Sequence, residues 1–313
     1  MGASVVVLCG GVGAARFLEG VVRVVDPETV TAIVNVADDA EFHGLRVSPD
    51  IDTVLYTLAG LVDPDQGWGV RGDTHMVQSA LARLGRDTWF QLGDADLATH
   101  IHRTALLREG VPLTEVTARL ARSLGVRARI LPSSDERQAT MVRTDGGWLP
   151  FQEYFVHRRQ QDTVREVRFD GAGKPTPGVI DAIDDARVVL VAPSNPIVSI
   201  GPILALAGVR AALARTPAPI VAISPIVGGE ALKGPAAAML ESLGHEVSPV
   251  GVARLYADFL DVMVLDERDA ALAPDVRAAG PRAVIAPTIM RDLAAKEQLA
   301  RFAIDAAVAH AGA

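Results

Sequence analysis

Short apolar runs alternate with longer amphipathic stretches along this chain. The runs are rich in Val, Ile, Leu and Ala, which is typical of strands covered on both faces of a sheet. They lie at 4–8, 29–34, 126–131, 187–191, 220–224, 262–266 and 284–286, and helical patterns follow at 52–59, 75–84, 112–124 and 290–309. This alternation predicts an α/β fold built on a Rossmann-like, doubly wound, mostly parallel sheet.

The middle of the chain has a different pattern. Runs at 140–143, 147–151 and 164–169 are shorter and lie around Asp-Gly turns, one between the first two runs and one after the third. Such spacing is typical of antiparallel hairpins. We therefore expect a single α/β domain over 1–313 with a β-rich insertion at about 130–175. A further strand is expected at 89–92.

The most apolar long run, 197–214, is interrupted by Pro202 and Arg210. It is shorter than a bilayer requires, so we interpret it as a buried helix. The chain starts directly with a strand-like run, without the charged and apolar regions of a signal peptide. Cys9 is the only cysteine, which excludes an intrachain disulfide and a Cys-rich zinc site. These features fit a cytoplasmic protein.

Composition narrows the class of protein further. The chain is 49% hydrophobic and only 4% aromatic, as expected for a globular enzyme with an aliphatic core. Its net charge of −8 argues against a general nucleic-acid binder, which needs a basic stripe to displace counterions. Any binding of phosphate must therefore be local.

A glycine-rich turn follows the first strand. Gly10, Gly11 and Gly13 let the backbone approach a ligand, and the N–H groups of the following helix attract an anion. Arg16 stands where a dinucleotide fingerprint has its third glycine, and a guanidinium suits a two-pronged grip on phosphate. The alternative for Arg16 is a surface position paired with Glu19 or solvent.

The stretch 35–52 after the second strand holds the densest group of acids. It contains Asp38, Asp39, Glu41, Asp50 and Asp52. Acids beyond the carboxyl end of a strand lie where α/β proteins bind ligands, and their oxygens suit Mg²⁺ that clamps phosphate. The alternative is a solvated acidic loop.

Asp94 and Asp96 follow the strand expected at 89–92. One of them could cap the helix that starts near Leu97, but two acids exceed what one cap needs. His100 and His102 lie two residues apart in that helix, so they face different ways and do not form a metal pair.

Two later loops follow strands and carry polar groups or glycines. Ser194 and Asn195 lie among prolines after 187–191, and Gly228 and Lys233 follow 220–224. Hydroxyl, amide and backbone donors at this edge suit a base, ribose or phosphate. Tight connection geometry is the plain alternative for the glycines.

Taken in order, these segments resemble the 2-phospho-L-lactate transferase family over nearly the whole chain. The similarity is carried by G-G-V-G-A-A-R-F-L, N-V-A-D-D, S-P-D-I-D-T-V-L-Y-T, L-G-D-x-D-x-A-T-H, L-P-x-S-D-E, P-S-N-P-I-x-S-I-G-P-I, S-P-I-V-G and D-x-L-D-V-x-V-L-D-E-R-D. Family members transfer a lactyl or enolpyruvyl phosphate from a guanosine diphosphate-linked donor to the deazaflavin Fo and release GMP, during biosynthesis of coenzyme F420. The G-G-V-G-A-A-R-F-L form resembles actinobacterial members, which implies the enolpyruvyl donor.

The resemblance also implies roles for particular residues. Asp38 and Asp50 would hold Mg²⁺, and Asp52 would orient or deprotonate the ribityl hydroxyl of Fo. The turn from Gly10 to Arg16 would approach the diphosphate. Ser194, Asn195, Gly228 and Lys233 would hold the nucleotide or acceptor, and a homodimer is expected. Asp94 would bind the cofactor. Many relatives have a basic residue between the acids of L-G-D-x-D, whereas this chain has Ala95.

Two other classes of function share parts of this pattern. A nicotinamide dehydrogenase would use the glycine turn, but the missing third glycine and the excess of acids count against it. A nucleotide-binding sensor without catalysis could share the scaffold, because fold does not fix function.

Overall fold

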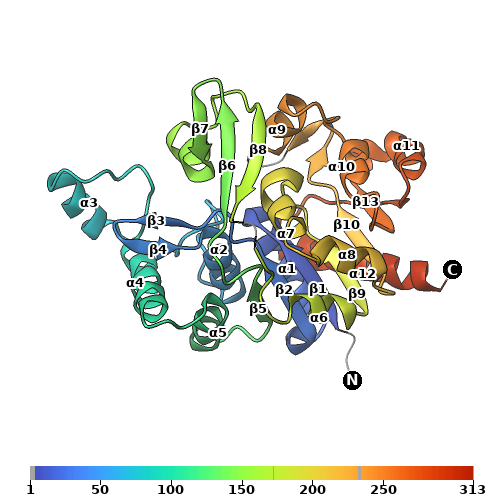
Figure 1. Ribbon diagram of the computed structural model, residues 1–313. Coiled ribbons are helices and arrows are strands. Elements are labelled where there is room, and N and C mark those ends of the chain that lie inside the picture. Colours follow the sequence, from blue (N-terminus) through green and yellow to red (C-terminus); the bar gives the residue numbers. More distant parts are fainter. Residues whose placement is uncertain (1–3, 172, 232–233, 313) are drawn as a thin grey trace.

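A computed structural model describes residues 4–171, 173–231 and 234–312. Its central sheet has seven parallel strands in the order β14-β13-β10-β9-β1-β2-β5 (Figure 1). From one edge to the other they are β14 (Arg282–Ile285), β13 (Val262–Leu265), β10 (Ile220–Ile223), β9 (Val188–Val191), β1 (Val5–Cys9), β2 (Val30–Val34) and β5 (Arg129–Pro132). The strand order reverses between β1 and β9, which is the switch point of a doubly wound sheet. The predicted fold class is confirmed.

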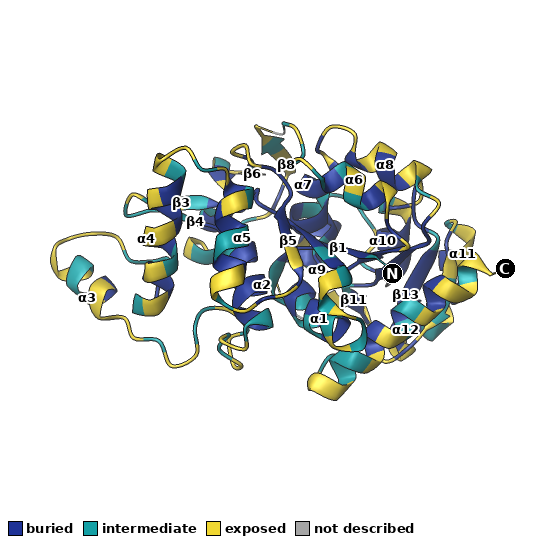
Figure 2. Ribbon diagram, turned by 90° about the horizontal axis from the view of Figure 1, so that it is seen from below, coloured by how far each residue is buried: buried dark blue, intermediate teal, exposed yellow. Residues whose placement is uncertain are grey.

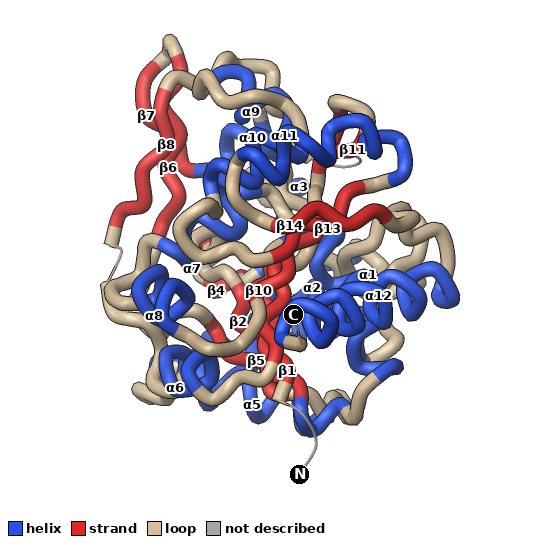
Figure 3. Tube along the Cα trace, turned by 90° about the vertical axis from the view of Figure 1, so that its right-hand side faces the viewer, coloured by secondary structure: helices blue, strands red, loops and turns tan. Residues whose placement is uncertain are grey.

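Helices cover both faces of this sheet (Figure 3). One face packs against α1 (Gly11–Val24), α2 (Pro49–Leu58), α5 (Leu113–Ser123) and α12 (Leu293–Ala311). The other packs against α6 (Val179–Asp184), α7 (Gly201–Leu204), α8 (Val209–Arg215), α9 (Ala236–Ser242), α10 (Pro249–Leu255) and α11 (Ala273–Ala278). Successive residues of β1 belong to the two cores in turn, because side chains of a strand alternate between faces. The inner strands β1, β9, β10 and β13 are buried, the edge strand β14 is partly exposed, and the outer helix faces are exposed (Figure 2).

The middle of the chain forms a separate antiparallel sheet in the order β7-β6-β8. Its strands are β6 (Ala139–Thr144), β7 (Gly147–Pro150) and β8 (Glu166–Asp170), and a π-helical turn, Glu153–His157, follows β7. The Thr140 N–H donates to the carbonyl of Ala37 at 2.7 Å, which ties this sheet to the acidic stretch. The predicted β-rich insertion is confirmed.

The acidic stretch is more ordered than the loop that the sequence suggested. It contains a hairpin of β3 (Ala40–Phe42) and β4 (Leu45–Val47), and α2 begins at Pro49, three residues before the predicted start. His43 and Gly44 have φ of 54° and 77°, the left-handed pair that a two-residue hairpin turn requires. Because proline favours the first helical position, Asp50 lies inside α2 and not in a loop.

A long excursion holds α3 (Met76–Arg83) and α4 (Asp94–Arg108), and α3 stands away from the main body (Figure 1). The strand predicted at 89–92 is wrong, because this segment pairs with a side chain instead of a strand. The amide of Gln78 donates to the Phe90 carbonyl at 2.6 Å and accepts from the Leu92 N–H at 3.3 Å.

The apolar run 197–214 is mostly buried up to Leu204 and alternates between buried and exposed residues after it, and the prediction of one helix is wrong. A π-helical turn, Pro196–Ile200, continues into α7, and the chain bends by 86° before α8. Gly208 precedes α8 with φ of 82°, a left-handed conformation that ends the helical path. Among the described residues no single helix is long and apolar enough to span a membrane. The segments Pro196–Leu204 and Val209–Arg215 reach the length of a membrane span only when they are counted together across the bend.

The remaining elements are short. They are the 3₁₀ turns Pro27–Thr29 and Glu267–Leu272 and the hairpin of β11 (Ile226–Val227) with β12 (Glu230–Ala231).

Candidate functional site

The carboxylate of Asp50 joins the loops after β1 and β2. Its Oδ1 accepts the Gly11 N–H at 2.9 Å, and its Oδ2 accepts the side-chain amide of Asn35 at 3.0 Å. Gly11 is the first residue of α1, so the positive end of that helix faces the carboxylate. Two regions that the sequence marked separately therefore meet at one point.

The loop after β9 closes the same site. A Cβ on Gly10 would lie 2.6 Å from the Cβ of Ser199, and one on Gly13 would lie 2.5 Å from the Pro193 carbonyl oxygen. Glycine is therefore required at both positions because the loop after β9 packs directly against this turn. The prediction that glycine allows close approach of a ligand remains untested for this turn.

Asp38 is the second buried carboxylate of the site. Burial, and then the negative charge of Asp50, raise the pKa of Asp38 well above its usual range. Its Oδ1 has no hydrogen-bond donor among the described residues. Gln152 of the insertion donates to the Asp38 carbonyl at 3.2 Å and holds the loop in place.

Burial also raises the pKa of Asp50 to about 6, although the bonds from Asn35 and Gly11 act in the opposite direction. Asp39 differs because it has a cation beside it. Burial raises the pKa of Asp39 to about 6, while Arg46, 3.2 Å away, opposes the shift. The Ser48 hydroxyl donates to Asp39 at 2.7 Å.

The Asp38 and Asp50 pair fits a hard divalent cation. Two buried carboxylates whose pKa values rise through burial form an unfavourable arrangement that a positive ion would relieve. Carboxylate oxygens are the ligands that Mg²⁺ prefers, and the unpartnered Oδ1 of Asp38 has lone pairs to offer.

Asp52 lies two residues further along α2, in the same first turn, and has different partners. Both of its oxygens accept hydrogen bonds from Arg103 of α4, with Nη1 at 3.0 Å from Oδ2 and Nη2 bonded to Oδ1. Arg103 is fully buried. Asp52 is therefore neither a helix cap nor a free carboxylate.

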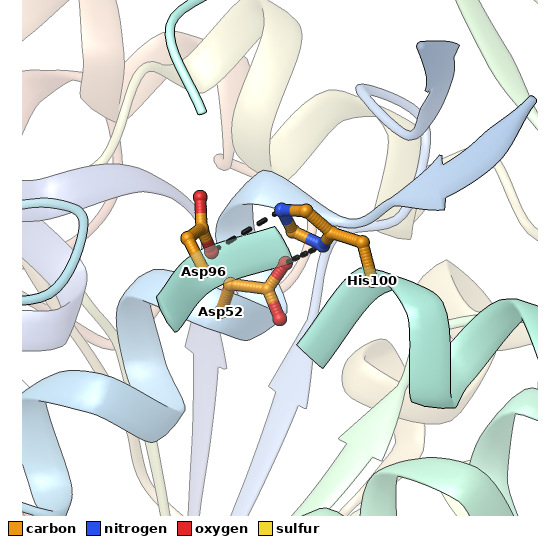
Figure 4. A group of neighbouring side chains, drawn as sticks. All are labelled: Asp52, Asp96 and His100. Carbon is orange, nitrogen blue, oxygen red and sulfur yellow. Dashed lines mark ion pairs between the residues drawn. The ribbon is translucent and has the colours of Figure 1, made fainter. Parts of the chain in front are cut away.

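His100 connects Asp52 to a third acid (Figure 4). Its Nδ1 lies 3.7 Å from Asp52 and its Nε2 lies 3.2 Å from Asp96. The Tyr56 hydroxyl donates to Asp96 at 2.8 Å. His102 is exposed, so the prediction that the two histidines do not form a pair is confirmed.

Asp94 caps the preceding helix. Its two oxygens accept the N–H groups of Met76 and Val77, both at 3.0 Å, at the start of α3. Asp73, which precedes α3, caps α4 in turn: its carboxylate accepts hydrogen bonds from the N–H groups of Ala95 at 2.9 Å and Asp96 at 3.0 Å. The cap expected for the helix near Leu97 is thus wrong in its acceptor, which is Asp73 and not Asp94 or Asp96. Binding of a cofactor by Asp94 stays a prediction.

The other predicted residues lie at the same edge of the sheet with contacts of their own. Arg16 donates to the Met290 carbonyl, while Glu19 pairs with Lys296 at 2.6 Å, so the Arg16–Glu19 alternative is wrong. Asn195 accepts from the N–H of Ile197 at 2.9 Å and caps the π-helical turn.

Ser194 and Gly228 have contrasting surroundings. The Ser194 hydroxyl is buried and has no partner among the described residues. The Gly228 N–H donates to both oxygens of Asp269, at 3.1 and 3.0 Å, in the loops after β10 and β13. Lys233 lies outside the described residues.

Several functional candidates were missed from sequence. Asn35 opened the acidic stretch but was not assigned a role, and Arg103, His100 and Tyr56 were not selected. The four-residue spacing of Asp96 and His100 on one helix was a usable signal, because such pairs share a face.

The fold and site together define a Rossmann-like α/β protein with buried carboxylates gathered beside the switch point of its sheet. Comparison with known proteins then gives the family. The model of the family described as "2-phospho-L-lactate transferase CofD" matches residues 5–292. The chain belongs to this family of transferases.

Two curated relatives illustrate the match. The chain is 42% identical over 297 residues to a 2-phospho-L-lactate transferase of Methanothermobacter thermautotrophicus, covering 95% of this chain and 96% of the relative. It is 43% identical over 311 residues to a phosphoenolpyruvate transferase of Streptomyces griseus, covering 97% and 98%. Membership of a transferase family argues against the dehydrogenase alternative.

A solved structure shows the same fold. A protein member of the UPF0052 family from Bacillus halodurans superposes with a TM-score of 0.64 at 17% identity, covering 96% of this chain and 98% of that one.

Proposed function

We propose that this chain transfers a phosphoenolpyruvyl or 2-phospho-L-lactyl group from a guanosine diphosphate-linked donor to the ribityl hydroxyl of the deazaflavin Fo, as a step of coenzyme F420 biosynthesis. The observation that carries the proposal is the buried pair Asp38 and Asp50, held against the start of α1. Relatives bearing the two transferase names are 43% and 42% identical to this chain, so identity does not separate the two donors. The G-G-V-G-A-A-R-F-L form favours the enolpyruvyl group.

Asp38 and Asp50 would hold Mg²⁺. When bound, the ion supplies positive charge to the phosphate oxygens of the donor. Asn35 and Gly11 fix both oxygens of Asp50 from opposite sides, so this carboxylate cannot swing away from the site. The insertion fixes Asp38 through Gln152 and Thr140. Such preorganisation favours phosphoryl transfer, where the protein contributes mainly position and charge.

The reaction is a displacement at phosphorus. The ribityl oxygen of Fo forms a bond to the phosphorus that carries the acid group, and the bond from that phosphorus to the GMP oxygen breaks. GMP leaves with the electron pair of the broken bond, and the hydroxyl proton passes to water. In-line placement of the hydroxyl and the leaving GMP provides much of the rate.

The nucleotide would lie along the edge formed by the loops after β1, β9 and β10. Arg16, Ser194, Asn195, Gly228 and Lys233 are our candidates for its contacts. The buried, unpartnered Ser194 hydroxyl supports this assignment, because a buried polar group normally has a partner. We also propose that the protein is a homodimer, which analytical ultracentrifugation of the purified chain would test.

Binding of the acceptor separates this proposal from a nucleotide sensor. Fo is fluorescent as a conjugated deazaflavin, so titration of the protein with Fo follows binding directly. We expect saturable binding by the wild type, in the presence of Mg²⁺ and a donor analogue or without them. Absence of saturable binding under all of these conditions would favour the sensor.

A further inference from the structure

Arg103 is the largest fully buried side chain among the described residues, and its contacts centre on Asp52. Besides both oxygens of Asp52, it reaches the Nδ1 atom of His100, 3.2 Å from its Nη1 atom. The same Nη1 atom lies 3.5 Å from the Arg46 carbonyl in β4. One guanidinium therefore connects α2, α4 and the hairpin.

These distances fix the tautomer of His100. A guanidinium only donates hydrogen bonds, so the Nδ1 atom that faces it must accept. The proton of the neutral ring then resides on Nε2, which lies 3.2 Å from Asp96 without forming a hydrogen bond to the described residues. Asp96 in turn accepts from Tyr56 of α2. The chain of contacts begins and ends on α2, the helix that carries Asp50.

Asp52, Asp96 and His100 have the residue types of a metal site, and one ligand atom of each lies within 4.8 Å of the others. The guanidinium argues against a cation there. The guanidinium already donates hydrogen bonds to the Asp52 carboxylate, and its Nη1 atom lies 3.2 Å from the Nδ1 atom of His100. A second positive charge in this buried place would be repelled strongly.

We propose that Arg103 and His100 are positioning residues for the transfer reaction, and that Asp52 serves to anchor the first turn of α2 instead of accepting the hydroxyl proton. Asp52 has both oxygens engaged by Arg103, and His100 contacts the same Nη1 atom of Arg103 that bonds Oδ2 of Asp52. Asp50 lies two residues earlier in the same helical turn. A displacement of Asp52 would therefore also displace Asp50. This inference rests on the proposed function.

Two substitutions of His100 separate the roles of its nitrogen atoms. His100→Asn keeps an acceptor oxygen close to the place of Nδ1, and His100→Gln keeps a donor close to the place of Nε2. The exposed His102→Asn, on the same helix, is the control. Transfer would be measured with purified full-length protein, Fo, donor and varied Mg²⁺, together with thermal unfolding.

In the proposal, the Nδ1 atom of His100 positions Asp52 because it accepts from Arg103. The side-chain oxygen of His100→Asn replaces this acceptor, so kcat should stay within about 3-fold of wild type, a small change in activation free energy. His100→Gln should lower kcat by about 10- to 100-fold, the usual effect of losing a supporting contact, with the KM for Fo little changed. Arg103→Lys should resemble His100→Gln, because an ammonium cannot bridge both oxygens and the ring.

Equal losses of kcat in both His100 variants, or losses that follow their melting temperatures, would overturn the positioning role. A metal-dependent rise in melting temperature that survives Asp38→Asn but not His100→Asn would overturn the exclusion of a cation. If the wild type turns over no substrate, the proposed function fails, and the inference fails with it.

Discussion

At the scale of single residues, the site concentrates buried negative charge where folding alone would avoid it. Asp38 keeps an unpartnered oxygen, and its pKa is raised by burial and by Asp50. Asp38→Asn removes one of these charges and retains the shape. We expect thermal unfolding at pH 7.5 to occur at the same temperature or higher, and turnover to fall on the order of 100-fold or more. A variant that loses stability and activity together would contradict this.

The raised pKa of Asp50 gives a pH dependence with a defined sign. Folding raises the pKa of Asp50 from 3.8 to about 6. Protonated Asp50 therefore adds to the free energy of unfolding, and this contribution is complete below pH 3.8 and is lost as pH rises through 6. Mg²⁺ binds the ionised form, so the rise in melting temperature that it causes should be small at pH 5 and larger at pH 7.5. Scanning fluorimetry with and without Mg²⁺ measures this. An equal shift at both pH values would count against Asp50 as a ligand.

Cys9 provides a check on the core around the glycine turn. It is fully buried at the end of β1, and burial raises the pKa of its thiol far above the usual range. The native protein should not react with a thiol reagent at pH 8, and the unfolded protein should react at one thiol per chain. Rapid labelling of the native state would show that the start of α1 opens readily.

The sequence was informative about residues near the site but not about their partners. The acids of 35–52 and the glycine turn were selected correctly as neighbours of one sheet edge. Asp52 and Arg103 are 51 residues apart, and no local pattern predicts that pair. Gly10 and Gly13 are required by the loop after β9, a contact that only the folded chain reveals.

At the scale of elements, α3 and α4 hold each other by reciprocal caps. Asp94 caps α3 and Asp73 caps α4, and a Cβ on Gly93 would lie 2.0 Å from Asp73. Asp73→Ala should therefore destabilise this excursion by about 0.5–2 kcal/mol, with little effect on the central sheet. Limited proteolysis should cleave the variant faster between α2 and α4. Asp87→Ala, an exposed acid of the same segment, is the control and should behave as wild type.

Two elements were predicted wrongly from the sequence, each for its own physical reason. The segment 89–92 has the composition of a strand, but the side chain of Gln78 supplies its hydrogen bonds. The run 197–214 is apolar throughout, and its bend follows from the backbone at Gly208, which apolar periodicity does not reveal. Elements of the central sheet were predicted well because their burial on both faces leaves a continuous apolar run.

At the scale of the whole molecule, the order of the seven strands brings the loops after β1, β2 and β9 together beside the switch point. The alternation of strands and helices predicted such a sheet, but the exact neighbours of each loop depend on packing. The central claim is that this edge transfers a phosphate-linked acid to Fo.

The most direct test is a mass-resolved product assay with Fo and each guanosine diphosphate-linked donor, with Mg²⁺ and with excess chelator. We expect Fo to gain the mass of one phosphoenolpyruvyl group, or of one 2-phospho-L-lactyl group, with one GMP released for each product and no product under chelation. Binding of a donor without any Fo adduct would contradict the transferase account. Undiminished product in excess chelator would contradict the metal site.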